Sequence, residues 1–189
     1  MRIPMAVVAV VTLSAPAGAQ PASQPPAPSC GVRGSQQWLS TRPSPLDSAT
    51  VTVGGTIAKL CYSAPSLRGR ALEDLIPEGR AWRTGANEPT TLTLTGRLDV
   101  GGAVLAPGRY VILTVPRADR WTLVFHTTPD SEPERMFASL QQVAQGSGQV
   151  ERLDAPVERF TVRPEGGAEA AFLLEWGERR VRVPVRAVP

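Results

Sequence analysis

The chain has 189 residues and a formal net charge of +3, and 42% of its residues are hydrophobic. This composition supports a folded core and excludes wholesale disorder, because the net charge is too small to oppose compaction. The same small charge gives no electrostatic reason to expect nucleic acid or an anionic membrane as a partner.

Three residue counts narrow the function further. One His and two Cys are too few for a zinc site of four such ligands and for most His-dependent hydrolase sites. The 19 Pro residues are about twice the usual share of roughly 5%, which argues against a mainly helical chain. We therefore expect no metal and no cofactor, and we assign no catalytic residue.

The first 19 residues have the pattern of a secretory signal peptide. Arg2 supplies the positive charge, residues 5–13 form a short apolar run, and small residues at 17–19 fit cleavage after Ala19. The run is too short to span a bilayer as a helix, and no later stretch is long and apolar enough. We predict an exported protein, periplasmic or extracellular; the alternative is a buried N-terminal strand or helix.

A Pro-rich linker is predicted at residues 20–29, because four Pro stand there among Ala, Gln and Ser. The folded domain is predicted to occupy residues 30–189. Cys30 and Cys61 are the two thiols, and an even pair in an oxidising compartment predicts a disulfide. The alternative is a free Cys30 beside the linker and a buried Cys61 in a strand.

Most of the predicted domain is typical of strands separated by turns. Trp121, Leu123 and Phe125 share one face of a strand, and residues 110–115 are continuously apolar, as in a strand covered on both faces. A hairpin turn is predicted at residues 99–102. In chain order, strands are predicted at residues 51–53, 56–63, 91–95, 110–115, 121–126, 159–163, 171–176 and 181–186.

Helix is predicted in two places only. Residues 72–76 can form one turn, and residues 132–145 are the longer candidate. In the second segment the apolar residues Met136, Leu140 and Val143 follow at spacings of four and three, and Gly146 can cap the C-terminus.

The last strands bring the predicted number to about eight or nine. Gly177 and Glu178 are predicted to turn the chain between them. Pro184 cannot donate a ladder hydrogen bond, so the final strand is predicted to lie at an edge or to end there. We predict a mostly β fold, a single antiparallel β-sandwich with little helix.

Short sequence blocks carry a resemblance to a known family. The block Trp-Arg-Thr-Gly-Ala-Asn-Glu at residues 82–88 is the most specific. The others lie at residues 65–70, 75–77, 79–80, 90–91, 105–110, 115–116, 121 and 172–185. With these blocks the chain resembles the bacterial exported family called domain of unknown function 2911 (DUF2911). The resemblance implies a secreted or periplasmic β-rich domain without an assigned activity, and this chain departs from the pattern at residues 129–149.

The densest polar chemistry lies between residues 68 and 88, in a stretch with little strand or helix pattern. Arg side chains present forked donors to carboxylate or phosphate, Trp offers a face to a ring, and Asn and Glu can bond hydroxyls. The block is therefore a candidate site for a small polar ligand, a glycan or an envelope protein. Its candidate ligand-binding residues are Arg68, Arg70, Trp82, Arg83, Asn87 and Glu88.

A structural role for the same block is the alternative. Trp82 would then belong to the core, Arg83 and Glu88 would pair, and Asn87 would bond the backbone of its own turn. On either interpretation we predict that Arg83, Asn87 and Glu88 converge, with Trp82 packed beneath them.

Two further features receive structural interpretations. His126 is predicted to be a surface or edge residue. Five Arg residues of the last strands are interspersed with acidic residues, which predicts a solvated sheet face of mixed charge. The residues are Arg159, Arg163, Arg180, Arg182 and Arg186, with Glu151, Asp154, Glu165, Glu169 and Glu178.

Two classes of function remain open on this sequence. The first is a non-catalytic binding or structural module of the cell envelope. The alternative is a periplasmic hydrolase that uses carboxylates such as Glu88.

Overall fold

The computed structural model describes residues 28–31, 35–129 and 133–188. The predicted signal peptide and residues 20–27 of the predicted linker lie outside these residues. The described strands are β1 (Leu46–Val53), β2 (Thr56–Ser63), β3 (Thr91–Leu94), β4 (Leu98–Val100), β5 (Ala103–Leu105), β6 (Gly108–Val115), β7 (Arg120–Thr127), β8 (Gln141–Glu165) and β9 (Ala171–Ala187). The described helices are α1 (Gln36–Thr41), α2 (Leu72–Leu75) and α3 (Pro133–Met136). In this part of the chain, no helix has the length and apolar character that crossing a membrane requires.

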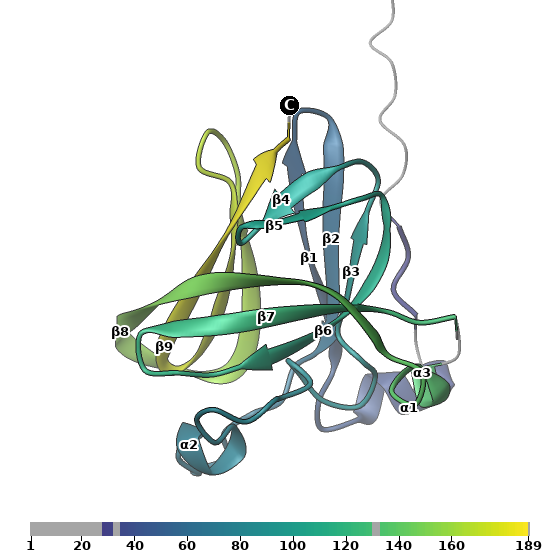
Figure 1. The fold of residues 1–189 in the computed structure, drawn as a ribbon. Helices are drawn as coiled ribbons and strands as arrows, with labels where there is room; N and C mark the ends of the chain where they lie inside the picture. Colours follow the sequence, from purple (N-terminus) through teal and green to yellow (C-terminus); the bar gives the residue numbers. More distant parts are fainter. Residues whose placement is uncertain (1–27, 32–34, 130–132, 189) are drawn as a thin grey trace, which may run out of the picture.

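The described strands form one antiparallel sheet of nine, in the order β1-β2-β3-β6-β7-β8-β9-β4-β5. The prediction of a mostly β, antiparallel fold with about eight or nine strands and little helix is confirmed. The strand order does not show the two separate sheets of a sandwich, because hydrogen bonding joins all nine strands. Figure 1 shows β1 to β3 running nearly across β7, with β6 bending between the two directions, so the sheet turns strongly along its width.

The sheet curls until its first strand contacts β8 and β9, and the core lies inside the curl. An aromatic cluster stands at its centre. Trp82 stacks on Trp176 with ring centroids 5.5 Å apart, and meets Trp121 and Phe160 edge-to-face at 6.0 and 5.2 Å. Tyr62 meets Phe160 edge-to-face at 5.3 Å. Such pairs add roughly 0.5–1.5 kcal/mol each beyond the area they bury.

The predicted disulfide is present between Cys30 and Cys61, whose Cα atoms are 5.6 Å apart. It joins the segment before α1 to the end of β2, and this prediction is confirmed. The predicted hairpin is also present, since β4 and β5 pair antiparallel and the Gly102 N–H donates to Asp99 Oδ1 at 2.8 Å. The short helix predicted at residues 72–76 is observed as α2.

The longer helix predicted at residues 132–145 is wrong. Helix α3 ends at Met136, and β8 begins at Gln141 and pairs with β7. Gly146 therefore lies in a strand rather than at a helix cap, and a Cβ on it would come within 2.6 Å of the Val100 carbonyl oxygen. The apolar spacing suited a helix, but pairing with β7 decided the conformation of this segment.

The predictions for the end of the chain need two corrections. Strand β9 continues through Gly177 and Glu178 without the predicted turn. Pro184 does not end the strand or lie at the sheet edge, because β9 pairs with β8 up to Arg182 and with β4 from Val185. Pro184, which has no N–H, thus lies where the partner of β9 changes from β8 to β4.

Candidate functional site

Two stretches cover the start and the end of the polar block, and we call them the outer segment (residues 65–73) and the inner segment (residues 82–88). The outer segment lies beside β8. The Leu67 N–H donates to the Glu158 carbonyl at 2.9 Å, and the Phe160 N–H donates to the Pro65 carbonyl at 2.8 Å. The Arg68 N–H donates to Glu158 Oε1 at 2.8 Å. These bonds hold the outer segment against the sheet.

Strand β8 is irregular next to the outer segment. Its register with β9 passes from Arg152 opposite Arg179 to Val157 opposite Gly177. Four residues of β8, 153–156, therefore face the single residue Glu178. We call residues 153–156 the bulged stretch. Such an insertion bends a strand and leaves its extra residues outside the ladder.

A cavity of about 610 Å³ lies between the outer segment and the irregular part of β8 and β9. Its volume is within the range of ligand pockets, about 300–1,000 Å³. Aliphatic side chains and charged groups of both signs share the lining. The lining residues are Leu67, Arg70, Ala71, Leu72, Glu73, Ala118, Val150, Glu151, Arg152, Pro156, Gly177, Glu178 and Arg179.

Ion pairs connect the walls of the cavity. Arg179 bonds Glu73 of α2 at 2.5 Å, and Arg152 bonds Glu178 across the two strands at 2.8 Å. The Arg152 and Glu178 side chains are 81% and 57% exposed, so that pair contributes about 0–1 kcal/mol. Arg70, which also lines the cavity, donates from Nε to the Leu67 carbonyl at 2.9 Å, and this bond holds its guanidinium against the outer segment.

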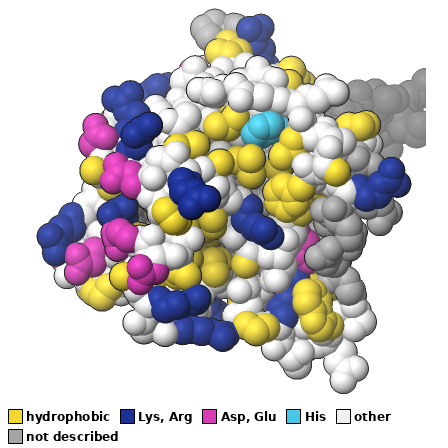
Figure 2. All heavy atoms as spheres, turned by 60° about the horizontal axis from the view of Figure 1, so that its bottom comes forward, with side chains coloured by type: hydrophobic (Ala, Val, Ile, Leu, Met, Phe, Trp, Pro, Cys, Tyr) yellow, Lys and Arg dark blue, Asp and Glu magenta, His cyan; other side chains and the backbone are white. Residues whose placement is uncertain are grey.

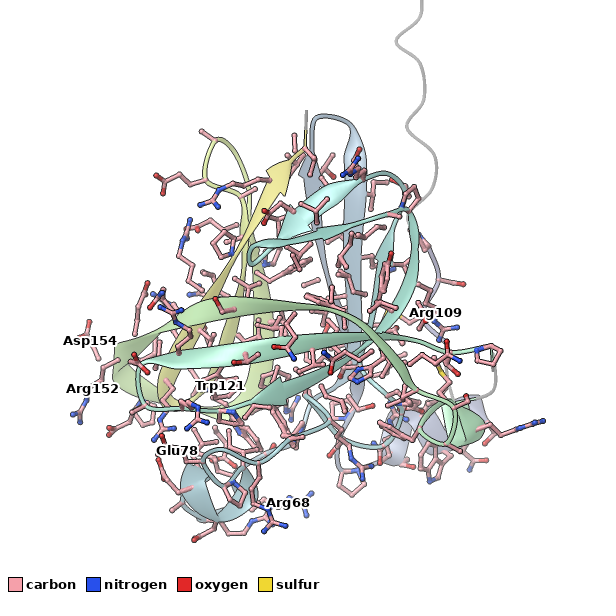
Figure 3. All side chains as sticks on the ribbon, viewed as in Figure 1. Arg68, Glu78, Arg109, Trp121, Arg152 and Asp154 are labelled. Atoms are coloured by element: carbon pink, nitrogen blue, oxygen red, sulfur yellow. A yellow bond between two sulfur atoms is a disulfide. The ribbon has the colours of Figure 1, made fainter. Side chains whose placement is uncertain are left out.

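Figure 3 shows Arg152 and Asp154 at the outer end of β8 and Arg68 beside α2. Figure 2 shows the underside of the molecule, where basic and acidic side chains alternate over the β8–β9 end. No broad field of one sign covers the described residues in this view.

The inner segment ends in a buried network. Glu88 is 3% exposed and accepts from Arg42 at 2.7 Å through one oxygen and from the Ser63 hydroxyl at 2.7 Å through the other. Arg42, which follows α1, also donates to Ser63 at 2.9 Å. Burial raises the pKa of Glu88, but the hydrogen bonds from Arg42 and Ser63 outweigh burial and hold the pKa below its ordinary value.

The rest of the inner segment is also bound into the fold. The Trp82 backbone pairs with Thr114 at 2.7 and 2.8 Å, which places the Trp82 ring in the aromatic cluster. Asn87 donates to the Ser44 carbonyl at 3.1 Å rather than to its own turn. Gly85 allows a close approach, because a Cβ there would lie 2.9 Å from the Ser63 carbonyl oxygen.

Arg83 does not join this network, so the predicted convergence is wrong for this residue. It is exposed, and its guanidinium lies 5.4 Å from the ring centroid of Phe137. The Glu88 partner is Arg42, which stands 46 residues earlier in the sequence. No sequence pattern indicated Arg42 or Ser63, because neither belongs to a motif and both reach Glu88 only through the folding of the sheet.

The predicted mixed-charge face is present on β8 and β9. Glu175 is 5% exposed and accepts from Arg163 at 2.7 Å and from Arg180 at 2.6 Å. Burial raises the pKa of Glu175, but the bonds from both guanidinium groups hold it below its ordinary value. Arg182 pairs with Glu165 on the same face. The one local signal of the cavity on β9 is the adjacent pair Glu178 and Arg179, which have opposite charges and both line it.

His126 is buried, not at the surface or at a sheet edge as predicted. It is 8% exposed, and the register of β7 with β8 shifts between Phe125 and His126. Its register partner Val111 is fully buried, so this part of the outer sheet face is covered. The alternation of residues along β7 correctly predicts the sheet face on which His126 lies. It does not predict that other residues cover this face.

Comparison with known proteins gives one match. The family model described as protein of unknown function (DUF2911) matches residues 44–185, a range that contains the outer segment, the inner segment and all of β1 to β8. No curated protein and no solved structure matches the chain. Because the family model spans most of the chain, the protein belongs to the DUF2911 family.

Proposed function

We propose that this protein is an exported, non-catalytic binding module of the cell envelope whose ligand site is the cavity beside the outer segment. The proposal rests on one observation, which is that two different parts of the chain form the walls of that cavity. Residues 67–73, which include part of the family pattern, form one wall, and the irregularity of β8 opens the space opposite them. Leu67 and Arg70 are both fixed by hydrogen bonds, so this wall is ordered.

The lining indicates a small polar ligand with aliphatic parts. Three Arg and three Glu side chains line the cavity, so their formal charges cancel. Leu67, Leu72 and Val150 supply apolar surface between the charged groups. Of the described residues that line the cavity, none is aromatic, and stacking of a sugar ring therefore has no platform there.

Export is supported by the disulfide, because such bonds persist in oxidising compartments. We propose that residues 1–19 are removed as a signal peptide and that residues 20–29 link the site of cleavage to the domain. Protein purified from a secreting host should begin at Gln20 on N-terminal sequencing. A mature chain that retains Met1 would contradict the proposed cleavage.

The geometry does not favour a hydrolase that uses Glu88. Both Glu88 oxygens accept hydrogen bonds inside the fold, and the lowered pKa keeps the carboxyl ionised at neutral pH. A general acid needs a proton to donate near the operating pH. Within the cavity, Glu73 and Glu178 are paired with Arg179 and Arg152.

A thermal-shift screen tests the proposed site. The purified protein is screened against free amino acids, short peptides and soluble oligosaccharides. Compounds that raise the melting temperature are then tested on Arg179→Glu, which places a negative charge beside Glu73 and Glu178. The proposal expects the shift to disappear in that variant.

Arg97→Glu is the matched control, since Arg97 is exposed on the β3–β4 turn and does not line the cavity. The control should keep the full ligand-induced shift. Equal loss in both variants, or no shift of the unmodified protein with any compound, would remove the support for this site.

A further inference from the structure

On one side of β8, the pairing with β7 ends before the pairing with the outer segment begins. Its ladder with β7 ends with Arg120 opposite Gln149, followed by one bond from the Val150 N–H to the Asp119 carbonyl at 2.9 Å. The outer segment pairs with β8 again only at residues 158–160. Between these points, no strand of the described residues pairs with the edge of β8 that β7 occupies earlier in the strand.

The bulged stretch lies in this interval. Its four residues also lack register partners in β9, because β9 offers only Glu178 opposite them. Leu153, Asp154 and Ala155 carry backbone N–H groups, and all four residues carry carbonyls. Backbone groups of this kind are strong hydrogen-bonding groups, and an incoming extended chain can satisfy them.

The cavity lies along the same interval. Ala118, next to the start of β7, lines one end, and Leu67 of the outer segment lines another part of the wall. From β8, residues 150–152 line it at the start of the interval, and Pro156 lines it at the end of the bulged stretch. The cavity therefore adjoins the unpaired backbone at its two ends, at residues 150–152 and at Pro156, and Leu153, Asp154 and Ala155 are not among its lining residues.

We propose that the ligand of the cavity is an extended peptide segment of another protein, which adds as a short strand to β8 beside the bulged stretch. This inference rests on the proposed function, because it names the ligand class of the same site. Backbone hydrogen bonds give affinity in this mode of recognition, and pockets for alternate side chains give specificity.

The walls indicate the kind of peptide. Leu67, Leu72 and Val150 accept aliphatic side chains. Arg179 and Glu178 stand on neighbouring positions of β9 and present opposite charges. A peptide that alternates aliphatic residues with charged residues of both signs matches this lining, whereas a uniformly acidic or basic peptide does not.

The residue types in this part of β8 also allow the opposite interpretation, that this edge is protected from pairing. Pro156 lacks an N–H, and charged side chains at Glu151, Arg152 and Asp154 are of the kind that protect exposed strand edges from pairing. If protection is their whole role, peptides do not pair with β8. The two possibilities give different results in a binding experiment.

The test uses a library of acetylated, amidated hexapeptides in which Val or Leu alternates with Lys, Glu or Ser. Binding to the purified protein is measured by fluorescence polarisation, and amide hydrogen exchange is followed by mass spectrometry. We expect members with mixed charge to bind and to slow exchange in the peptide fragment that contains residues 153–155. Exchange in the β8–β9 turn at residues 166–167 should not change.

Backbone methylation of the bound peptide separates strand addition from binding by side chains alone. Methylating the amides on one edge of the peptide should weaken binding by about tenfold, because two backbone bonds are lost, while methylating the other edge should have little effect. Equal effects on both edges, or protection confined to other fragments, would overturn strand addition.

The two proposals fail in different ways. If amino acids or oligosaccharides bind and lose binding in Arg179→Glu while no peptide of the library binds, the cavity remains the ligand site and the peptide inference is wrong. If neither the peptides nor the small molecules bind, both proposals are overturned.

Discussion

The outer and inner segments are similar in composition but lie in opposite environments. Both contain Arg and Glu residues, and both carry parts of the family pattern. The inner segment buries Glu88 at 3% exposure between Arg42 and Ser63, whereas Arg70 in the outer segment is exposed beside the cavity. The comparison shows that one dense polar pattern can contain both a buried structural network and an exposed segment beside a cavity, and that burial tells them apart.

The largest expected effect comes from breaking the inner network. Arg42→Ala removes the ion-pair partner of a carboxylate that is almost fully buried. Losing one member of a buried pair costs about 3–5 kcal/mol, because the remaining charge is poorly compensated. Chemical denaturation of the variant measures this change in the free energy of unfolding.

Arg83→Ala is the control within the inner segment. Arg83 is exposed and touches the Phe137 ring, so its loss should cost only about 0.5–1 kcal/mol. If Arg83→Ala destabilises as much as Arg42→Ala, the assignment of Arg42 as the structural partner is wrong.

The disulfide should have the next largest effect, because it fixes the end of β2 that carries Ser63. Replacing Cys30 and Cys61 together by Ser should lower the free energy of unfolding by roughly 3–4 kcal/mol, on the chain-entropy model for a loop of this separation. Denaturation of the unmodified protein with and without reductant gives an independent measurement. A change below about 1 kcal/mol in both experiments would contradict this prediction.

Acid should weaken the inner segment in a defined direction. The folded-state pKa of Glu88 lies below its ordinary value of 4.5, so the unfolded chain takes up a proton first as the pH falls. The stability that this carboxylate contributes is present above about pH 4.5 and is lost as the pH falls through the lower folded-state pKa. The free energy of unfolding is measured by denaturation between about pH 3 and 7, a range that includes the ordinary pKa of Glu. It should fall more steeply with acid for the unmodified protein than for Glu88→Gln. Glu175 adds a loss of the same sign in both proteins. Parallel curves would contradict the prediction.

The smallest effect on stability is expected in the outer segment. Arg179→Ala breaks the pair with Glu73, whose side chain is 62% exposed, and should cost about 0–1 kcal/mol. The same change should impair binding at the cavity. A loss as large as that of Arg42→Ala would show that the outer segment is structural as well, and the contrast between the two segments would disappear.

Local pattern was enough for much of the fold. Alternation along β7 placed Trp121, Leu123 and Phe125 on the buried face, and the two Cys residues in a chain predicted to be exported predicted the observed bond. These inferences succeed because side-chain alternation along a strand, and pairing of two thiols, need little information about distant residues. The helix expected at residues 132–145 fails for the complementary reason, since pairing with β7 outweighs local spacing.

The sequence by itself determined that the chain is a mostly β, antiparallel domain, and it located the polar block. Only the tertiary structure decided which part of the block is buried and which part lies beside the cavity. The Glu88 partner is 46 residues away, and the cavity needs a bulge in β8 to meet a segment some 80 to 90 residues earlier in the chain. Contacts between such distant residues depend on the register and curvature of the whole sheet, which no local pattern encodes.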